Sequence, residues 1–308
     1  MATILISGGS GLIGKALSAM LIKSGHTVIV LSRKKRADTD VRYALLDVGK
    51  QTIDKDAIRA ADHIIHLAGA GVADKRWTKK RKEEIINSRT QSSALLMKAL
   101  AETPNKVQSF ISSSAIGWYG PDPVVPNPHP FTESAPHAGD FLGNTCAAWE
   151  ASVQPVTAMG KRLVILRTGI VLSREGGALK EFLKPVNVGV ASIFGNGRQV
   201  LSWIHITDLC RLYQAAIEDE QLSGVYNAVA TLPVSNKMLM TELAKKVKGN
   251  FYMPFYIPAF LLKAALGEMS IEILKSATVS NQKISERFQF LYPSITAALN
   301  NLFPGKKA

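Results

Sequence analysis

Residues Ser7–Gly14 read SGGSGLIG, with glycines at every third position, Gly8, Gly11 and Gly14. The stretch follows a short apolar run, residues 2–6, and leads into a segment with helical periodicity. Between a strand and a helix, such glycines permit a tight turn, the approach of backbone to a pyrophosphate and close helix–strand packing. The helix N-terminus then presents N–H groups to the anion. The pattern predicts a dinucleotide-binding loop; a tight turn without a ligand is the alternative.

The end of the next apolar segment, residues 26–32, indicates which dinucleotide is bound. It closes with Ser32 and Arg33, and three further cations follow at 34–36. Proteins that prefer NAD place an acid here for the ribose 2′-hydroxyl, whereas arginine can pair with a 2′-phosphate. The sequence therefore favours NADP(H), with Ser32 and Arg33 as its contacts. An ordinary basic turn is the alternative.

Strand-like and helix-like segments alternate through the first half of the chain. This order predicts an α/β fold, a Rossmann-type doubly wound parallel sheet. We expect a dinucleotide-binding domain over 1–172, to which the chain returns at 200–230, and a smaller, mostly helical substrate-side region over 173–308 with a C-terminal helical extension over about 250–308. The main expected strands are 4–6, 26–32, 43–46, 63–67, 107–113, 162–172 and 224–228, and the main helices are 12–23, 83–102, 141–159, a helix capped by Asp208, and 235–247.

The composition excludes several classes of protein. The chain has 308 residues, 46% hydrophobic and 20% charged, as in ordinary globular proteins. No apolar run approaches the roughly 18 residues that cross a bilayer. The two cysteines, Cys146 and Cys210, lie far apart, which favours a reducing, cytoplasmic location and argues against a disulfide framework or a metal site. We expect a small-molecule substrate, and the sequence assigns no oligomeric state.

The chain is strongly basic, with a net charge of +13, and its densest cluster is KRWTKKRK at residues 75–82. One interpretation is a nucleic-acid surface. The cluster lies in no recognisable nucleic-acid-binding module, and most such runs are solvated faces, so nucleic-acid binding is the disfavoured reading. The surplus of cations would instead favour an anionic substrate.

Further motifs, taken with the glycine loop, resemble those of a known family. HLAGAG at 66–71 and SSSAIGWYG at 112–120, together with the glycine loop, resemble the extended short-chain dehydrogenase/reductases. HLAGAGVADKRWT, INSR, LRTGIVL and WIHITDL are similar to one atypical subgroup, the NAD(P)-dependent epimerase-family proteins. Many of its members carry a C-terminal helical extension, which the tail 253–303 resembles. The resemblance covers nearly the whole chain and implies the Rossmann fold.

The resemblance also implies roles for individual residues. The glycine loop would hold the pyrophosphate, and the residues after the next strands would hold the ribose and phosphate groups. Glu84 and Arg89 fall where members of the subgroup contact NADPH, and Val171 would lie near the nicotinamide. The implied cofactor-binding residues are Gly8, Gly11, Leu12, Ile13, Gly14, Ser32, Arg33, Leu67, Ala68, Gly69, Glu84, Arg89 and Val171.

One feature of the resembled superfamily is missing. Its members use a tyrosine as general acid/base, with a lysine four residues later that lowers the tyrosine pKa. None of the seven tyrosines here is followed by lysine at that spacing. If Glu150 matches the glutamate that often follows the motif, Leu142 and Cys146 occupy the tyrosine and lysine positions. The subgroup is known for lacking the pair.

Other residues are candidates for catalysis. Ser114, or Ser113, could orient a carbonyl, and Tyr119 could donate the proton if its loop covers the nicotinamide. His205 is a third candidate, and structural roles are the alternative for each. The sequence thus predicts an NADP(H)-binding oxidoreductase or epimerase-like protein acting on a small carbonyl or nucleotide-linked substrate. A non-catalytic NADP(H)-binding sensor or scaffold is the alternative.

Overall fold

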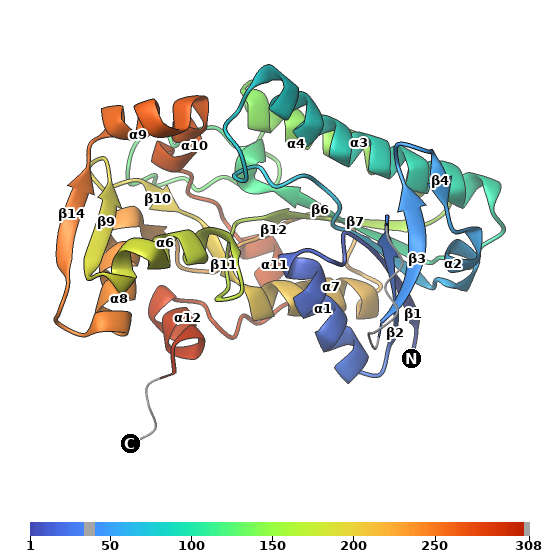
Figure 1. Ribbon diagram of the computed structural model, residues 1–308. Helices are drawn as coiled ribbons and strands as arrows, with labels where there is room; N and C mark the ends of the chain where they lie inside the picture. The colour runs from blue at the N-terminus through green and yellow to red at the C-terminus, as the bar shows by residue number, and fades with distance from the viewer. Residues whose placement is uncertain (34–40, 305–308) are drawn as a thin grey trace.

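A parallel sheet with helices on both faces forms the body of the molecule (Figure 1). The computed structural model describes residues 1–33 and 41–304. Within them the largest sheet has eight strands in the order β12-β7-β6-β5-β1-β2-β3-β4, all parallel except β4. These strands are β1 (Thr3–Ser7), β2 (Thr27–Ser32), β3 (Arg42–Asp47), β4 (Thr52–Ile53), β5 (His63–His66), β6 (Ser109–Ala115), β7 (Arg162–Thr168) and β12 (Gly224–Ala228). The predicted doubly wound parallel sheet is confirmed.

Two hydrophobic cores lie on opposite faces of this sheet, because alternate residues of each strand point to opposite sides. In β1, Ile4 and Ile6 join one core and Leu5 joins the other. The first core is covered by α1 (Leu12–Lys23) and α7 (Ile206–Glu218), and the second by α2 (Lys55–Ala60), α3 (Lys79–Glu102), α4 (Phe141–Val153) and α5 (Pro155–Ala158). Within the described chain, no helix is long and apolar enough to cross a membrane.

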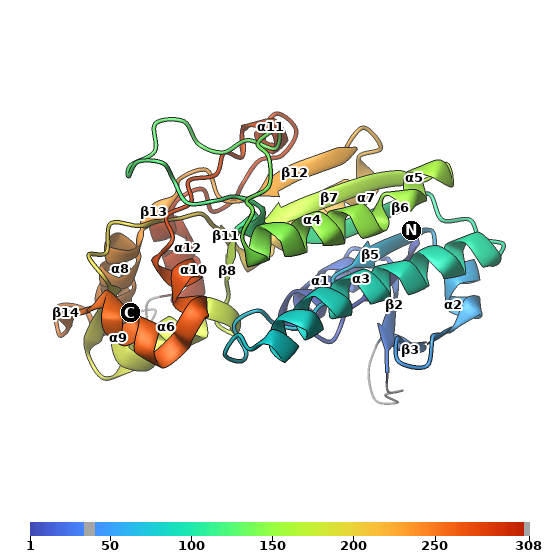
Figure 2. The same cartoon turned by 90° about the horizontal axis from the view of Figure 1, so that it is seen from above.

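A second region lies beyond one end of the sheet in both views (Figures 1 and 2) and has a third core of its own. The extension begins with a strand, β14, that pairs in parallel with β9; helices then dominate it, as predicted. The elements of this region are α6 (Gly177–Asn187), β9 (Val190–Phe194), β10 (Val200–Leu201), β13 (Val234–Ser235), α8 (Asn236–Lys248), β14 (Met253–Ile257), α9 (Ala259–Leu266), η2 (Gly267–Met269), α10 (Ser270–Leu274) and α12 (Ile295–Leu302). Helix α11 (Gln282–Ser285) instead packs on β12, and its Ile284 joins the first core.

The strand expected over 162–172 is divided, and this break directs the chain into the second region. Gly169 separates β7 from β8 (Ile170–Leu172), which leaves the large sheet and pairs in parallel with β11 (Trp203–His205). A Cβ at Gly169 would lie 2.7 Å from the Ser202 carbonyl oxygen, so only glycine allows this close approach. The helix expected over 141–159 is likewise divided into α4 and α5, with Pro155 beginning the second.

Asp208 does not cap its helix, contrary to the sequence prediction. His205 is the N-cap of α7, and its Nδ1 accepts a hydrogen bond from the Thr207 N–H at 3.1 Å. Asp208 lies in the first turn, fully buried, and accepts the backbone N–H groups of Leu291 at 3.0 Å and Tyr292 at 2.8 Å. This carboxylate therefore holds the end of the chain against α7.

We predict that Asp208→Ala destabilises the protein by about 2–4 kcal/mol, because the Leu291 and Tyr292 N–H groups and the Arg211 guanidinium all lose the same buried acceptor. Urea unfolding followed by circular dichroism measures the change. Asp56→Ala is the control: its carboxylate is 78% exposed in an ion pair with Arg59, and its loss should cost less than about 1 kcal/mol. Equal stability of the two variants would refute the role given to Asp208.

Candidate functional site

The glycine loop is built by contacts that no side chain could share. Gly8 has φ +81°, and a Cβ there would lie 2.8 Å from the Ala68 nitrogen at the end of β5. A Cβ at Gly14 would lie 2.4 Å from the Gly9 Cα, so the first turn of α1 packs directly on the loop. Gly11 is the N-cap of α1, and no described side chain caps this helix. The first N–H groups of α1, beginning with Leu12 and Ile13, therefore remain available to an anion.

The residues expected at the adenosine end lie along the same edge of the sheet. Ser7 pairs with Leu31 in the parallel register of β1 and β2, so Ser32, the last residue of β2, and Arg33, which follows it, lie beside the glycine loop. Ser32 is half-buried and Arg33 is exposed. The further cations expected at 34–36 lie outside the described residues. This edge of the sheet thus presents an arginine and no acid immediately after β2.

Arg89 lies beneath the segment that follows β5. A Cβ at Gly69 would be 2.9 Å from the Arg89 guanidinium carbon. Arg89 Nη1 donates to the carbonyls of Ala70 and Ile85 at 3.0 and 2.9 Å, and burial lowers the pKa of this side chain. The structure therefore brings Gly69 against Arg89, and Leu67 and Ala68 against Gly8. Glu84 differs, because it is exposed on α3 and accepts a hydrogen bond from Arg81 at 2.7 Å.

Val171, on β8, approaches the glycine loop from the second region. A Cβ at Gly177 would contact both the Leu12 side chain, at 3.3 Å, and the Val171 carbonyl oxygen, at 3.6 Å. The start of α6 therefore packs on the first residue of α1. Sequence-distant segments thus meet where the two regions join.

A cavity of about 690 Å³ opens between the sheet and the second region. Its wall includes the end of β6, one face of α4, part of α6 and α8, and the extension from Ile257 to Ala277. Most of the lining is apolar. Representative lining residues are Ala115, Gly117, Leu142, Cys146, Trp149, Phe182, Phe194, Met240, Ile257, Leu266, Met269 and Ile273.

Leu142 and Cys146 face this cavity from successive turns of α4. The Cys146 thiol donates to the Ala115 carbonyl at 3.6 Å, and Gly117 packs against both side chains. Burial, reinforced by the Glu150 carboxylate, raises the pKa of Cys146 to about 12. These two positions therefore present a hydrocarbon and a neutral thiol to the cavity.

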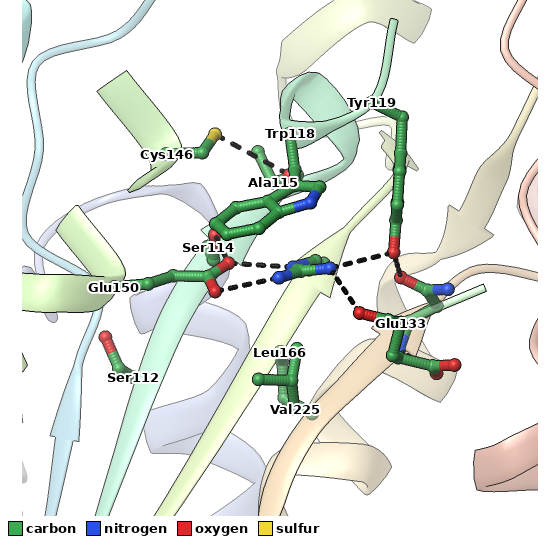
Figure 3. A network of polar contacts seen from close by, with 12 residues as sticks. Ser112, Ser114, Ala115, Trp118, Tyr119, Glu133, Cys146, Glu150, Leu166 and Val225 are labelled. Carbon is green, nitrogen blue, oxygen red and sulfur yellow. Dashed lines mark hydrogen bonds and ion pairs between the residues drawn. The ribbon is translucent and has the colours of Figure 1, made fainter. Parts of the chain in front are cut away.

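A buried ion pair lies beside the cavity floor, between Glu150 of α4 and Arg167 of β7. Arg167 Nε and Nη2 donate to the two carboxylate oxygens of Glu150 at 2.8 and 3.0 Å. The Arg167 guanidinium also stacks on Trp118, with its carbon 3.6 Å from the ring centroid. Although burial acts to lower it, the pKa of Arg167 is raised by its hydrogen bonds and the charge of Glu150. Figure 3 shows Glu150 and Tyr119 on opposite sides of the network, and Arg167 donates to both.

This network engages both proposed catalytic residues. The Ser114 hydroxyl donates to Glu150 at 2.7 Å. The Tyr119 hydroxyl accepts from Arg167 at 3.1 Å and donates to the Asn227 side-chain oxygen at 2.7 Å. Tyr119 is fully buried, and burial raises its pKa. Neither side chain lines the cavity and both hydroxyls are hydrogen-bonded within this network, which favours the structural alternative for Ser114 and Tyr119.

His205 also has structural contacts. Besides capping α7, its ring lies 4.0 Å from that of Tyr292, and burial lowers its pKa to about 4. Ser113 is buried as well. The structure thus assigns the third candidate to the join between α7 and the end of the chain.

The basic stretch at 75–82 contacts the extension. Trp77 is buried against Met269, with its ring 4.9 Å from that of Phe141. Lys82 pairs with Glu268, and Arg76 donates to the Ala264 carbonyl at 3.5 Å. Part of the cluster that suggested a nucleic-acid surface therefore fastens the extension to α3.

The sequence did not predict which residues line the cavity. Its extension residues lie more than a hundred positions from those of α4, and each reads as ordinary core. One signal was available for the ion pair: Arg167 interrupts an apolar strand and Glu150 an apolar helix, and buried charges require partners.

Comparisons with known proteins define the class of protein. The model of the NAD dependent epimerase/dehydratase family matches residues 4–228, and a domain of unknown function, DUF1731, matches residues 257–302. The chain belongs to the NAD dependent epimerase/dehydratase family. The suggested resemblance to an epimerase-family subgroup with a C-terminal extension is confirmed.

The individual relatives cover the whole chain. Epimerase family protein YfhF of Bacillus subtilis is 33% identical over 99% of both chains, and epimerase family protein Mb2239 of Mycobacterium bovis is 33% identical over 97% of this chain and 96% of its own. Among solved structures, human epimerase family protein SDR39U1 with NADPH is similar with a TM-score of 0.87 and 26% identity, covering 98% of this chain and 99% of the human one.

We predict that Tyr119→Phe lowers the free energy of unfolding by about 1–2 kcal/mol, because Asn227 and Arg167 each lose a buried partner. NADPH affinity should stay within about twofold of the parent. Urea unfolding and NADPH fluorescence titration measure both, with Tyr256→Phe, an exposed tyrosine, as the control. Lost NADPH-dependent turnover at unchanged stability would instead make Tyr119 the acid.

We also predict that Cys146 resists alkylation in the folded protein. With a pKa of about 12, roughly one thiol in ten thousand is ionised at pH 8. Iodoacetamide labelling followed by peptide mass spectrometry should be slow near neutral pH, rise about tenfold per pH unit while the fold persists, and become fast in denaturant. Rapid labelling of the folded chain at pH 7 would show an activated thiolate.

Proposed function

We propose that this protein is an NADP(H)-dependent oxidoreductase or epimerase-like enzyme that acts on a small carbonyl compound in the cavity beside the glycine loop. The observation that carries the proposal is the cradle at Gly8 and Gly14, where any Cβ would collide with backbone. That close approach, together with the uncapped start of α1, suits a pyrophosphate. The residues present therefore fit a dinucleotide.

The preference for NADP(H) rests on the residues after β2. Arg33 is exposed beside the glycine loop, and its guanidinium can pair with a 2′-phosphate. Within the described residues, β2 ends at Ser32 and is followed directly by Arg33, so no acid stands there to bind a ribose 2′-hydroxyl. The human relative's structure is described as containing NADPH, which agrees with this assignment.

The proposed site supplies orientation and exclusion of water more than acid–base chemistry. When bound, the nicotinamide supplies or accepts a hydride. Leu142 and Gly117 form an apolar wall, and the Cys146 thiol beside them keeps its proton, which it donates to the Ala115 carbonyl. Ser114 and Tyr119 hold the floor of the cavity through Glu150 and Arg167. Proton transfer therefore falls to a neutral donor or to solvent.

The second candidate function is a non-catalytic NADP(H)-binding sensor or scaffold. Leu142 and Cys146 favour it, because neither can serve as the usual acid–base pair. This function predicts tight NADPH binding without turnover and a partner whose affinity changes with cofactor state.

Spectroscopy at 340 nm separates the two functions. Purified protein is titrated with NADPH and then assayed for NADPH oxidation with a panel of aldehydes, ketones and sugar nucleotides. Turnover with any of these compounds supports the enzyme. Binding without turnover across the panel supports the sensor, and no binding of NADPH refutes both.

Arg33→Asp should weaken NADPH binding about 10- to 100-fold and leave NADH affinity unchanged or improved, because it removes a bidentate partner of the 2′-phosphate and adds repulsion. Fluorescence titration with both nucleotides measures the effect. Arg42→Asp is the matched control: it makes the same change of charge at the start of β3, beside Ile29, and should leave both affinities unchanged. Equal loss of NADPH and NADH in Arg33→Asp would refute the assignment.

A further inference from the structure

We propose that the cavity binds a neutral, mainly apolar ligand rather than a nucleoside diphosphate or another anion. This inference deepens the proposed function, because it names the class of substrate for the same site. It depends on the cavity wall, which is separate from the glycine loop.

The cavity is large and its wall is mostly hydrocarbon. A volume of about 690 Å³ is within the usual range for sites of drug-sized molecules. Aromatic, aliphatic and thioether side chains come from three parts of the chain: α4, the α6–β9–α8 unit and the extension. They include Phe182, Phe194, Met240, Leu266, Met269 and Ile273.

The charged residues of the wall cancel one another. Among the described lining residues the cations are Arg89 and Lys275, and the anions are Glu181 and Glu272. Lys275 Nζ lies 2.7 Å from a Glu272 carboxylate oxygen and donates to the Tyr119 carbonyl at 3.2 Å. A diphosphate would have to break this pair or stay unpaired in an apolar wall, and an uncompensated buried ion is strongly disfavoured.

Arg89 is committed to the protein. Its Nη1 donates to two backbone carbonyls, and its guanidinium carbon lies 4.9 Å from the Trp149 ring centroid. Glu181 pairs with Lys184 at 2.6 Å, and its side chain is 63% exposed, so its charge is not buried in the wall. The net charge of +13 is therefore carried elsewhere on the molecule, and the anionic substrate expected from it does not match this wall.

One polar group offers a specific contact to a neutral ligand. Asn236, at the start of α8, is 1% exposed and lines the cavity. Its Oδ1 accepts from the Phe194 N–H at 2.8 Å, which fixes the amide orientation. Its Nδ2 makes no hydrogen bond to another described residue, so it is available to a carbonyl or hydroxyl oxygen of the ligand. The expected ligand thus has an apolar body and at least one neutral acceptor.

Fluorescence of N-phenyl-1-naphthylamine, a neutral apolar probe, tests this inference on the full-length protein without cofactor. We expect saturable binding that 2-decanone reverses and that UDP-glucose at equal concentration does not. Displacement of the probe by UDP-glucose, or absence of saturable binding, would overturn the inference. NADPH titration of the same sample reports separately on the proposed function, so the two can fail independently.

Two variants on one helix locate the probe. Ile273 lines the cavity from α10, whereas Ile271 on the same helix is 57% exposed. Ile273→Trp should fill part of the cavity and weaken probe binding at least about tenfold, whereas Ile271→Trp should leave probe binding unchanged. Thermal melting confirms that both are folded. Equal probe affinity in the two folded variants would refute the assignment.

Asn236→Asp tests a second wall of the cavity, because it replaces the amide donor with a carboxylate. We expect it to lower the affinity for the probe as Ile273→Trp does.

Discussion

The buried pair between Arg167 and Glu150 is the contact that fixes the centre of this molecule. An arginine near the end of a buried strand is tolerated only with a carboxylate and further acceptors, because an unpaired charge there would cost several kcal/mol. Its partners come from β6, α4, the loop before α4 and, through Asn227, β12 and the extension. Residues that face the cavity, such as Ala115 and Cys146, are neighbours of this network in sequence. The position of the residues at the cavity floor therefore depends on an ion pair that lies behind them.

Local patterns in the sequence predicted the cofactor half of the molecule well. The bounds of α1 and β12 agree to the residue, because glycine spacing and strand periodicity are written within a few neighbouring positions. Long-range pairings were not predictable in this way. Asp208 has the form of a helix cap, yet its acceptors serve N–H groups more than eighty residues away. The apolar run 162–172 hides the break at Gly169, because only its approach to Ser202 requires one.

Net charge was a poor guide to the site for a related reason. Charge counts sum over the whole surface, whereas a cavity is described by the few residues that line it. Here one cation of the wall is neutralised by Glu272 and the other is held by backbone carbonyls. The basic stretch at 75–82 is the densest source of positive charge. Three of its residues, Arg76, Trp77 and Lys82, contact the extension. Sequence composition could not separate these uses.

The extension contacts α3 through the pair of Lys82 and Glu268, and other residues of the extension form one wall of the cavity. Within the described residues, it makes no contact with the glycine loop. The residues of this one wall are consequently encoded apart from the glycine loop, whereas the other walls belong to the rest of the chain. Under the proposed function, substitutions confined to the last fifty residues would therefore change the compound that the cavity accepts while the glycine loop stays intact. The tail would then act as a part of the molecule that adjusts selectivity without rebuilding the Rossmann body.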